Sequence, residues 1–182
     1  MIFALAVISL VASLALGGIY NVTKEPITEA RKAKAKMAIM EVIPEFDTLI
    51  TFKAMPADGT DSIVFNVGYQ GDSIVGVAVA TYSNKGYNST PILLMVGFLP
   101  DSTIRNISVV QQKETPGLGT KMAEPKFKDQ FNGINPEKFK IKVKKDGGDV
   151  DAITAATISS RAFCDAVNRA YTTLQTEGGK IK

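Results

Sequence analysis

The sequence predicts an α+β domain attached to a single N-terminal transmembrane helix, with an antiparallel sheet flanked by helices. Three observations lead to this class: an uncharged stretch at residues 1–20, a series of Val-, Ile- and Phe-rich segments separated by turn residues, and a closing segment with helical periodicity. The 182 residues suffice for one domain with a substantial core and an appendage. We expect an anchor at residues 1–20, a connecting helix at 21–44 and the domain at 45–182.

The anchor is predicted from residues 1–20, whose only polar side chains are those of Ser9, Ser13 and Tyr20. Twenty helical residues span roughly 30 Å, about the thickness of the hydrocarbon layer. A signal peptide fits less well, because no basic region precedes the long apolar run. The positive-inside tendency alone would leave the domain in the cytoplasm, since four basic residues follow closely. They are Arg31, Lys32, Lys34 and Lys36.

A connecting helix is expected from about residue 26 to residue 43. Thr23 is a candidate N-cap, Pro26 suits the first turn, and Pro44 would end the helix. The lysines of this helix would lie on its solvated side, since its apolar residues fall roughly on one face. The segment is therefore interpreted as a stem that joins the membrane to the domain.

The domain begins with a β-rich region and closes with a helix. Short separations between consecutive apolar segments favour antiparallel pairing over βαβ crossovers. The spacing of apolar residues near the C-terminus predicts a helix that packs one face against the sheet. Strands are expected at residues 62–67, 73–83, 92–98, 103–111 and 139–143, and helices at 121–131 and 159–176.

Composition excludes several kinds of site. The chain has no His and one Cys, Cys164, which rules out an internal disulfide, a Cys-based zinc or iron–sulfur site and catalysis by imidazole. No metal site is expected, and Cys164 is interpreted as a buried structural thiol. A net charge of +3 without interleaved basic and aromatic residues gives no support for nucleic-acid binding. Redox chemistry in this chain would need an organic cofactor.

Two segments outside the strands are candidates for a binding site. Residues 151–160 form a turn of small and hydroxyl-bearing residues that opens into the last helix, where free N–H groups suit an anion. The alternative is that the Thr and Ser residues are ordinary N-caps and that Asp151 is a cap or turn residue. Residues 113–121 follow a strand and contain the tight turn Pro116–Gly117, although a simple strand-to-helix connection is the alternative. Neither segment matches a phosphate-binding P-loop or a GxGxxG fingerprint.

Taken together, these motifs resemble a known family. The chain has an apolar anchor, then Gly86–Tyr87 before a strand, then the run ETPGLG at residues 114–119, then TAATIS at residues 154–159. This order is similar to the FMN-binding domain family shared by the G subunit of the Rnf complex and the C subunit of the sodium-pumping NADH:quinone reductase. The family's attachment motif, Ser/Thr-Gly-Ala-Thr-x-Ser/Thr, differs from this sequence only at Ala155. If that position requires a positive φ, alanine there is unfavourable.

The resemblance implies a covalent flavin site. FMN would be joined to Thr157 by a phosphoester, with the ETPGLG segment as the opposing wall. The residues around Ala155 favour the Rnf-type protein over the quinone-reductase protein. The implied function is electron transfer within an ion-translocating ferredoxin:NAD oxidoreductase. The implied cofactor-binding residues are Thr154, Ala155, Ala156, Thr157, Ile158, Ser159, Glu114, Thr115, Gly117, Leu118, Gly119 and Lys121.

The implied partners are other membrane and redox subunits, a flavin transferase and the lipid bilayer. The family places this domain on the extracytoplasmic side of the bacterial cytoplasmic membrane. We expect that side despite the charge count, on the expectation that the true N-terminal flank is missing. The alternatives are the C subunit of a quinone reductase, a stand-alone membrane-anchored flavin reductase, and an adaptor without enzymatic function.

Overall fold

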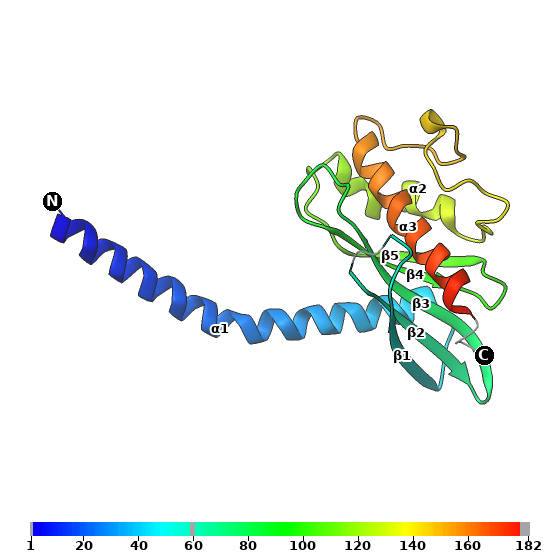
Figure 1. Cartoon of the computed structure of the whole chain (residues 1–182), viewed down its shortest axis with the longest axis horizontal. Helices are drawn as coiled ribbons and strands as arrows, with labels where there is room; N and C mark the ends of the chain where they lie inside the picture. Colours follow the sequence, from blue (N-terminus) through cyan, green and yellow to red (C-terminus); the bar gives the residue numbers. More distant parts are fainter. Residues whose placement is uncertain (1, 59–60, 179–182) are drawn as a thin grey trace. The chain divides into compact units, whose positions relative to one another are not determined.

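The structure, a computed structural model, describes residues 2–58 and 61–178. The chain forms two units, Met1–Lys36 and Met37–Lys182. The second unit is built on a five-stranded antiparallel sheet whose strands pair in chain order (Figure 1). The strands are β1 (Thr48–Ala54), β2 (Ile63–Gln70), β3 (Ser73–Ser83), β4 (Ile92–Phe98) and β5 (Ile104–Gln111). The α+β class predicted from the sequence is confirmed.

Four of the five strands lie where the sequence predicts them. β3 and β4 have the expected bounds, and β2 and β5 differ only at their ends. β1 was not expected. β1 pairs with β2, and Ala54 is the one residue of β1 that is buried. Because a strand with little burial needs few apolar residues, its sequence shows only a weak apolar alternation.

The main core lies between the sheet and α3 (Thr157–Glu177). Successive residues of a strand point to opposite faces, so Val77 and Val79 belong to this core whereas Ala78 belongs to the cluster on the other face. Phe127 and Phe163 meet edge to face within the core, with ring centroids 5.1 Å apart. The predicted closing helix is therefore confirmed as the element that covers the sheet.

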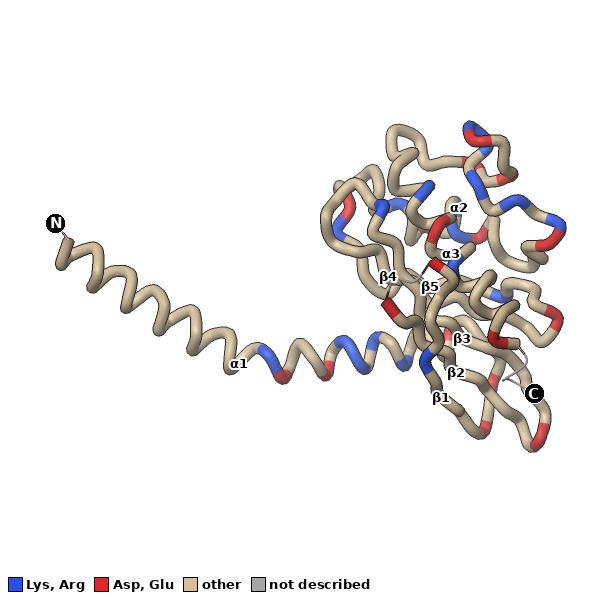
Figure 2. Tube along the Cα trace, viewed as in Figure 1, with Lys and Arg blue, Asp and Glu red and all other residues tan. Residues whose placement is uncertain are grey.

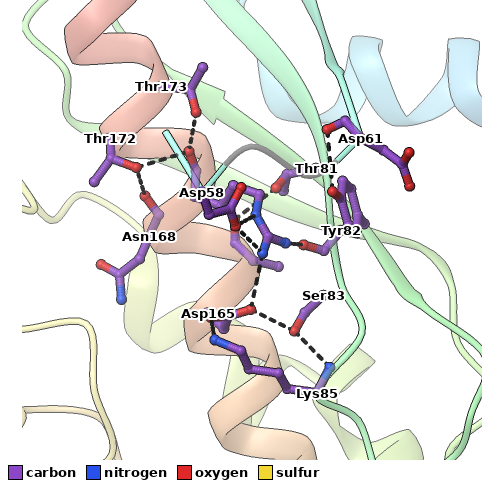
Figure 3. Close-up of polar contacts among 12 residues, drawn as sticks. Asp58, Asp61, Thr81, Tyr82, Ser83, Lys85, Asp165, Asn168, Thr172 and Thr173 are labelled. Atoms are coloured by element: carbon purple, nitrogen blue, oxygen red, sulfur yellow. Dashed lines mark hydrogen bonds and ion pairs between the residues drawn. The ribbon is translucent and has the colours of Figure 1, made fainter. Parts of the chain in front are cut away.

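Polar side chains fix α3 against β3 and the segment before β2 (Figure 3). The carboxylate of Asp165 accepts hydrogen bonds from the Ser83 hydroxyl at 2.8 Å and from Lys85 Nζ at 2.6 Å. Arg169 forms an ion pair with Asp58 at 2.5 Å, and its side chain is only 10% exposed. Water screens a half-buried pair less than a surface pair. These contacts hold the middle of α3 in place against the sheet.

The opposite face of the sheet carries the end of α1 (Ile2–Val42). A Cβ built on Gly97 would lie 2.0 Å from the carbonyl oxygen of Val42, so only glycine permits this approach. Glu41 fastens the same helix end, since its carboxylate accepts a hydrogen bond from Ser108 at 2.7 Å and pairs with Lys128 at 3.2 Å. The residues buried together on this face are Ala38, Ile39, Val42, Ile43, Ala78 and Met95.

α1 is one helix of 41 residues and is long and apolar enough to cross a membrane. No charged residue occurs before Lys24, as the first part of α1 in Figure 2 shows. The expected cap at Thr23 is wrong: its hydroxyl donates to the carbonyl of Ile19 at 2.8 Å, and Pro26 lies inside the helix. Helix-forming residues on both sides let the helix continue, because a single proline removes one backbone donor. The helix ends at Val42, shortly before Pro44, as predicted.

Two predicted elements between β5 and α3 differ from the structure. The expected helix at 121–131 is split into η1 (Gly119–Ala123), α2 (Pro125–Lys128) and η2 (Asp129–Phe131). Pro125 explains the split, because it disfavours helical geometry at Glu124, whose ψ is 143°. The expected strand at 139–143 is wrong. Only an isolated bridge joins Val143 to Val150, and the turn η3 (Lys144–Asp146) follows directly.

Candidate functional site

A pocket of about 510 Å³ opens between the first turn of α3 and the turn that follows β5. Its volume lies in the range of small-molecule sites, roughly 300–1,000 Å³. Hydroxyl groups and backbone amides share the lining with exposed apolar side chains, so the pocket suits a ligand with an anionic end and an apolar body. The lining residues are Tyr87, Thr115, Leu118, Gly119, Ala155, Ala156, Thr157, Ile158 and Ser159.

The start of α3 offers unpaired donors to this pocket. The helix begins at Thr157, and no side chain caps it; the cap position is Ala156. The first N–H groups of a helix lack intrahelical acceptors and lie at the positive end of its dipole. No hydrogen bond joins the Thr157 hydroxyl to another described residue. The interpretation of Thr and Ser residues as N-caps is therefore wrong at this helix start, and an anion bound there would meet free donors.

The loop before α3 is held by Ser160 and contains a strained residue. The Ser160 hydroxyl accepts a hydrogen bond from Ile153 N–H at 2.9 Å and donates to the Ala156 carbonyl at 3.0 Å. Ala155 adopts a φ of +59°, in the left-handed region that a Cβ disfavours. The position where the family motif has glycine thus does require a positive φ. Ser160 was missed as a site residue because a serine within the first turn of a helix gives no sequence signal for such a role.

The pocket lies in a region shared with known proteins. Residues 86–172 match the family described as the FMN-binding domain, and all the lining residues fall in that range. The G subunit of the ion-translocating oxidoreductase complex of Methanosarcina acetivorans is 31% identical over 182 residues, covering 98% of this chain and 95% of that protein. The chain belongs to the family of these G subunits.

A further relative agrees with this assignment. The G subunit of the Na⁺-translocating ferredoxin:NAD⁺ oxidoreductase complex of Acetobacterium woodii is 33% identical, covering 90% of this chain and 85% of that protein. Among solved structures, NqrC of Shewanella oneidensis has a TM-score of 0.49 and 20% identity, covering 78% of this chain and 72% of that chain. The resemblance stated from the motifs is confirmed, and the relatives' names support the Rnf-type assignment over the alternative quinone-reductase protein.

In this member of the G-subunit family, most of the predicted site residues meet at the pocket. Thr115, Leu118 and Gly119 line it from one side, and residues 155–159 line it from the other. Gly117 lies in the adjoining turn, with φ +75° and its N–H bonded to Thr120 at 3.0 Å. Four predicted residues are outside the lining, and we retain their ligand roles only as predictions. They are Gly117, Glu114, Thr154 and Lys121. Glu114 is buried, and Thr154 and Lys121 line a second cavity of about 230 Å³.

Tyr87 is a lining residue that the predicted set lacks. It lies in the loop between β3 and β4, far in sequence from both motif segments, and its side chain is 72% exposed. The pairing of β3 with β4 fixes both ends of this loop. The pair Gly86–Tyr87 belongs to the resemblance and was the available signal, but sequence alone does not show which way the ring points.

Asp151 and Cys164 lie outside the lining of this pocket. Asp151, a residue of the loop, pairs with Lys144 at 2.8 Å on the surface. Burial raises the pKa of the Cys164 thiol to about 12, so this group is neutral at physiological pH. Within residues 2–58 and 61–178, no group of three or more His, Cys, Asp or Glu side chains is arranged to hold a metal ion.

Proposed function

We propose that this protein is the electron-carrying subunit of a membrane-bound, ion-translocating ferredoxin:NAD⁺ oxidoreductase complex and holds FMN through a phosphoester bond to Thr157. The observation that carries the proposal is the position of Thr157. It is the first residue of an uncapped helix, its hydroxyl has no partner among the described residues, and it lines the 510 Å³ pocket. Membership of the G-subunit family and the match to the FMN-binding domain support the same conclusion.

The lining fits FMN at both ends. Backbone N–H groups of the first turn of α3 and the helix dipole would stabilise the phosphate's remaining negative charge. The exposed apolar side chains of Tyr87, Leu118 and Ile158 would contact the ring system. FMN supplies the electron transfer itself. A covalent bond removes the need for high affinity, so an open pocket suffices to orient the ring and present its edge to other carriers.

Other subunits would complete the reaction. The sequence contains no motif for a ferredoxin or for NAD, and the chain is therefore expected to pass electrons between carriers held by its partners. A flavin transferase would form the bond to Thr157. The lipid bilayer would hold α1, with the domain on the extracytoplasmic side of the bacterial cytoplasmic membrane.

Replacement of Thr157 tests the attachment. The full chain is co-expressed with a flavin transferase, and covalent flavin is measured as fluorescence on a denaturing gel and as added mass on the peptide containing residue 157. We expect loss of the signal in Thr157→Ala and its retention in Thr172→Ala, which removes an exposed hydroxyl from the same helix outside the pocket lining. A fluorescent band in Thr157→Ala would overturn the assignment.

Assembly and topology are tested separately. Purification from native membranes should yield the protein with several other subunits, whereas recovery as a solitary active reductase would favour the stand-alone alternative. Absence of bound flavin after co-expression with the transferase would favour the adaptor. Protease added to intact spheroplasts should cleave the domain, and protection from the protease would place the domain in the cytoplasm.

A further inference from the structure

Glu114 is a buried carboxylate just behind the wall of the pocket. It is 4% exposed. Its Oε2 accepts hydrogen bonds from the Ser159 hydroxyl at 2.5 Å and from Tyr87 N–H at 3.2 Å, and its Oε1 accepts one from Asn88 N–H at 3.1 Å. These donors come from two segments that are remote from residue 114 in sequence. One carboxylate therefore joins the β3–β4 loop and the first turn of α3 to the ETPGLG turn.

Two glycines leave the space that this carboxylate occupies. A Cβ on Gly86 would lie 2.7 Å from Glu114 Oε1. A Cβ on Gly119 would lie 2.6 Å from Glu114 Cβ and 2.5 Å from the Ser159 hydroxyl oxygen. Any larger residue at either position would displace the carboxylate or its partner. The close approach of the three segments around Glu114 thus requires glycine at both positions.

The Glu114 side chain is held by hydrogen bonds alone. No ion pair involves it within residues 2–58 and 61–178. A buried carboxylate requires hydrogen-bond donors, and these donors in turn require an acceptor that can serve all of them. Glutamine has nearly the same shape but only one acceptor oxygen, so at least one of the two backbone N–H groups would lose its partner.

We propose that Glu114 is the positioning residue of the flavin site: its carboxylate holds the first turn of α3, which carries Thr157, at a fixed distance from the wall formed by Tyr87 and the ETPGLG turn. The segments that it joins contribute lining residues on opposite sides of the pocket. Glu114 acts through these segments, because its side chain is buried and lies outside the pocket lining. The expected effect on flavin rests on the proposed attachment of FMN to Thr157. The hydrogen bonds that join Glu114 to Ser159, Tyr87 and Asn88 are a property of the chain without ligand.

The experiment compares Glu114→Gln, Ser159→Ala and the double variant with a matched control, Asp47→Asn. The control also converts a carboxylate that accepts a hydrogen bond from a backbone N–H of another segment into an amide, but that N–H belongs to Gly71 and Asp47 is not part of the pocket lining. All are studied as full chains in detergent. Hydrogen exchange is followed by mass spectrometry on peptides spanning residues 84–92 and 155–163 without flavin. The yield of covalent flavin and the quenching of flavin fluorescence by iodide are then measured, well below the melting temperature of each variant.

We expect exchange at Tyr87 or Asn88 to accelerate at least tenfold in Glu114→Gln, because one of these N–H groups loses its acceptor, with no change there in Asp47→Asn. Covalent flavin yield should fall several-fold and iodide quenching should rise about twofold in Glu114→Gln and Ser159→Ala. The effect of the double variant should be smaller than the sum of the two single effects, because Ser159 and Tyr87 bond the same oxygen of Glu114 and the two changes are therefore coupled. Wild-type exchange in Glu114→Gln, or equal effects in Asp47→Asn, would overturn the proposal. If the wild-type protein took no flavin at Thr157, the proposed function would be refuted instead. The exchange data would still show whether Glu114 holds the β3–β4 loop and the first turn of α3 together.

Discussion

Replacement of Ala155 by glycine should stabilise this protein, which is unusual for a residue at a ligand site. Ala155 has a φ of +59° and lies in an exposed loop. A residue with a Cβ in the left-handed region is disfavoured by about 1–2 kcal/mol relative to the right-handed conformation. Glycine has no such preference, so the folded state of Ala155→Gly loses this strain.

The unfolded state opposes part of the gain. Glycine gives the unfolded chain more conformational freedom than alanine, which favours unfolding by roughly 0.4–1 kcal/mol. The difference leaves a net stabilisation of about 0.5–1 kcal/mol. For a domain of this size the melting temperature should therefore rise by about 2–3 °C. The change also removes a methyl group from the pocket lining, so covalent flavin yield should not decrease.

Thermal unfolding of the full chain in detergent, followed by circular dichroism, measures the effect. Gly147→Ala is the matched control: Gly147 has a φ of +79° and open space around its Cβ position, so alanine there should lower the melting temperature by a similar amount. Equal melting temperatures for wild type and Ala155→Gly, together with a lowered value for Gly147→Ala, would refute the reasoning that residue 155 is strained.

Three further predictions concern the rest of the domain. Cys164 should not react with Ellman's reagent at pH 8 until the protein is denatured, because a pKa of about 12 leaves a thiolate fraction of only about 10⁻⁴; rapid labelling of native protein would contradict its burial. Gly97→Ala should lower the unfolding free energy by roughly 1–3 kcal/mol in a denaturant titration, because the added Cβ would overlap the carbonyl of Val42; an unchanged midpoint would contradict this packing. Arg161→Gln should raise the pKa of Asp146, which the Arg161 hydrogen bonds hold below 3.8. That pair stabilises the folded state above the unfolded pKa, so the stability gap between wild type and variant should shrink as the pH falls below 3.8, and a gap independent of pH would exclude the pair as its cause.

The elements predicted well are those whose signal is local. β3, β4 and α3 have uninterrupted apolar patterns, and the structure reproduces them closely. The wrong predictions concern a segment with a strand-like pattern but no strand to pair with, and a segment with a helical pattern that contains a proline. Apolar and polar residues alternate over residues 139–143 as in a strand. Among the described residues, however, this segment forms only one isolated bridge, between Val143 and Val150. Pro125 divides a segment that reads as one helix.

The candidate site was predictable in part for the same reason. The loop and first turn around Thr157 are contiguous in sequence, so a motif captures them. Strand register brings Tyr87 into the pocket lining, and hydrogen bonds between distant segments place Glu114 directly behind it. A sequence motif identifies Glu114 as part of the site but cannot show that its carboxylate faces inward, onto a serine hydroxyl and two backbone amides.

The packing of the end of α1 against the sheet determines where a soluble fragment of this protein can begin. Residues 38–43 cover an apolar face that would otherwise meet water, and burial of their three large side chains stabilises the fold by about 5–8 kcal/mol. That amount is comparable with the whole stability of many domains. A fragment that starts at residue 37 keeps this cover and should remain monomeric. One that starts at residue 45, at the sequence-based boundary, would expose Met95 and Ala78 and is expected to aggregate.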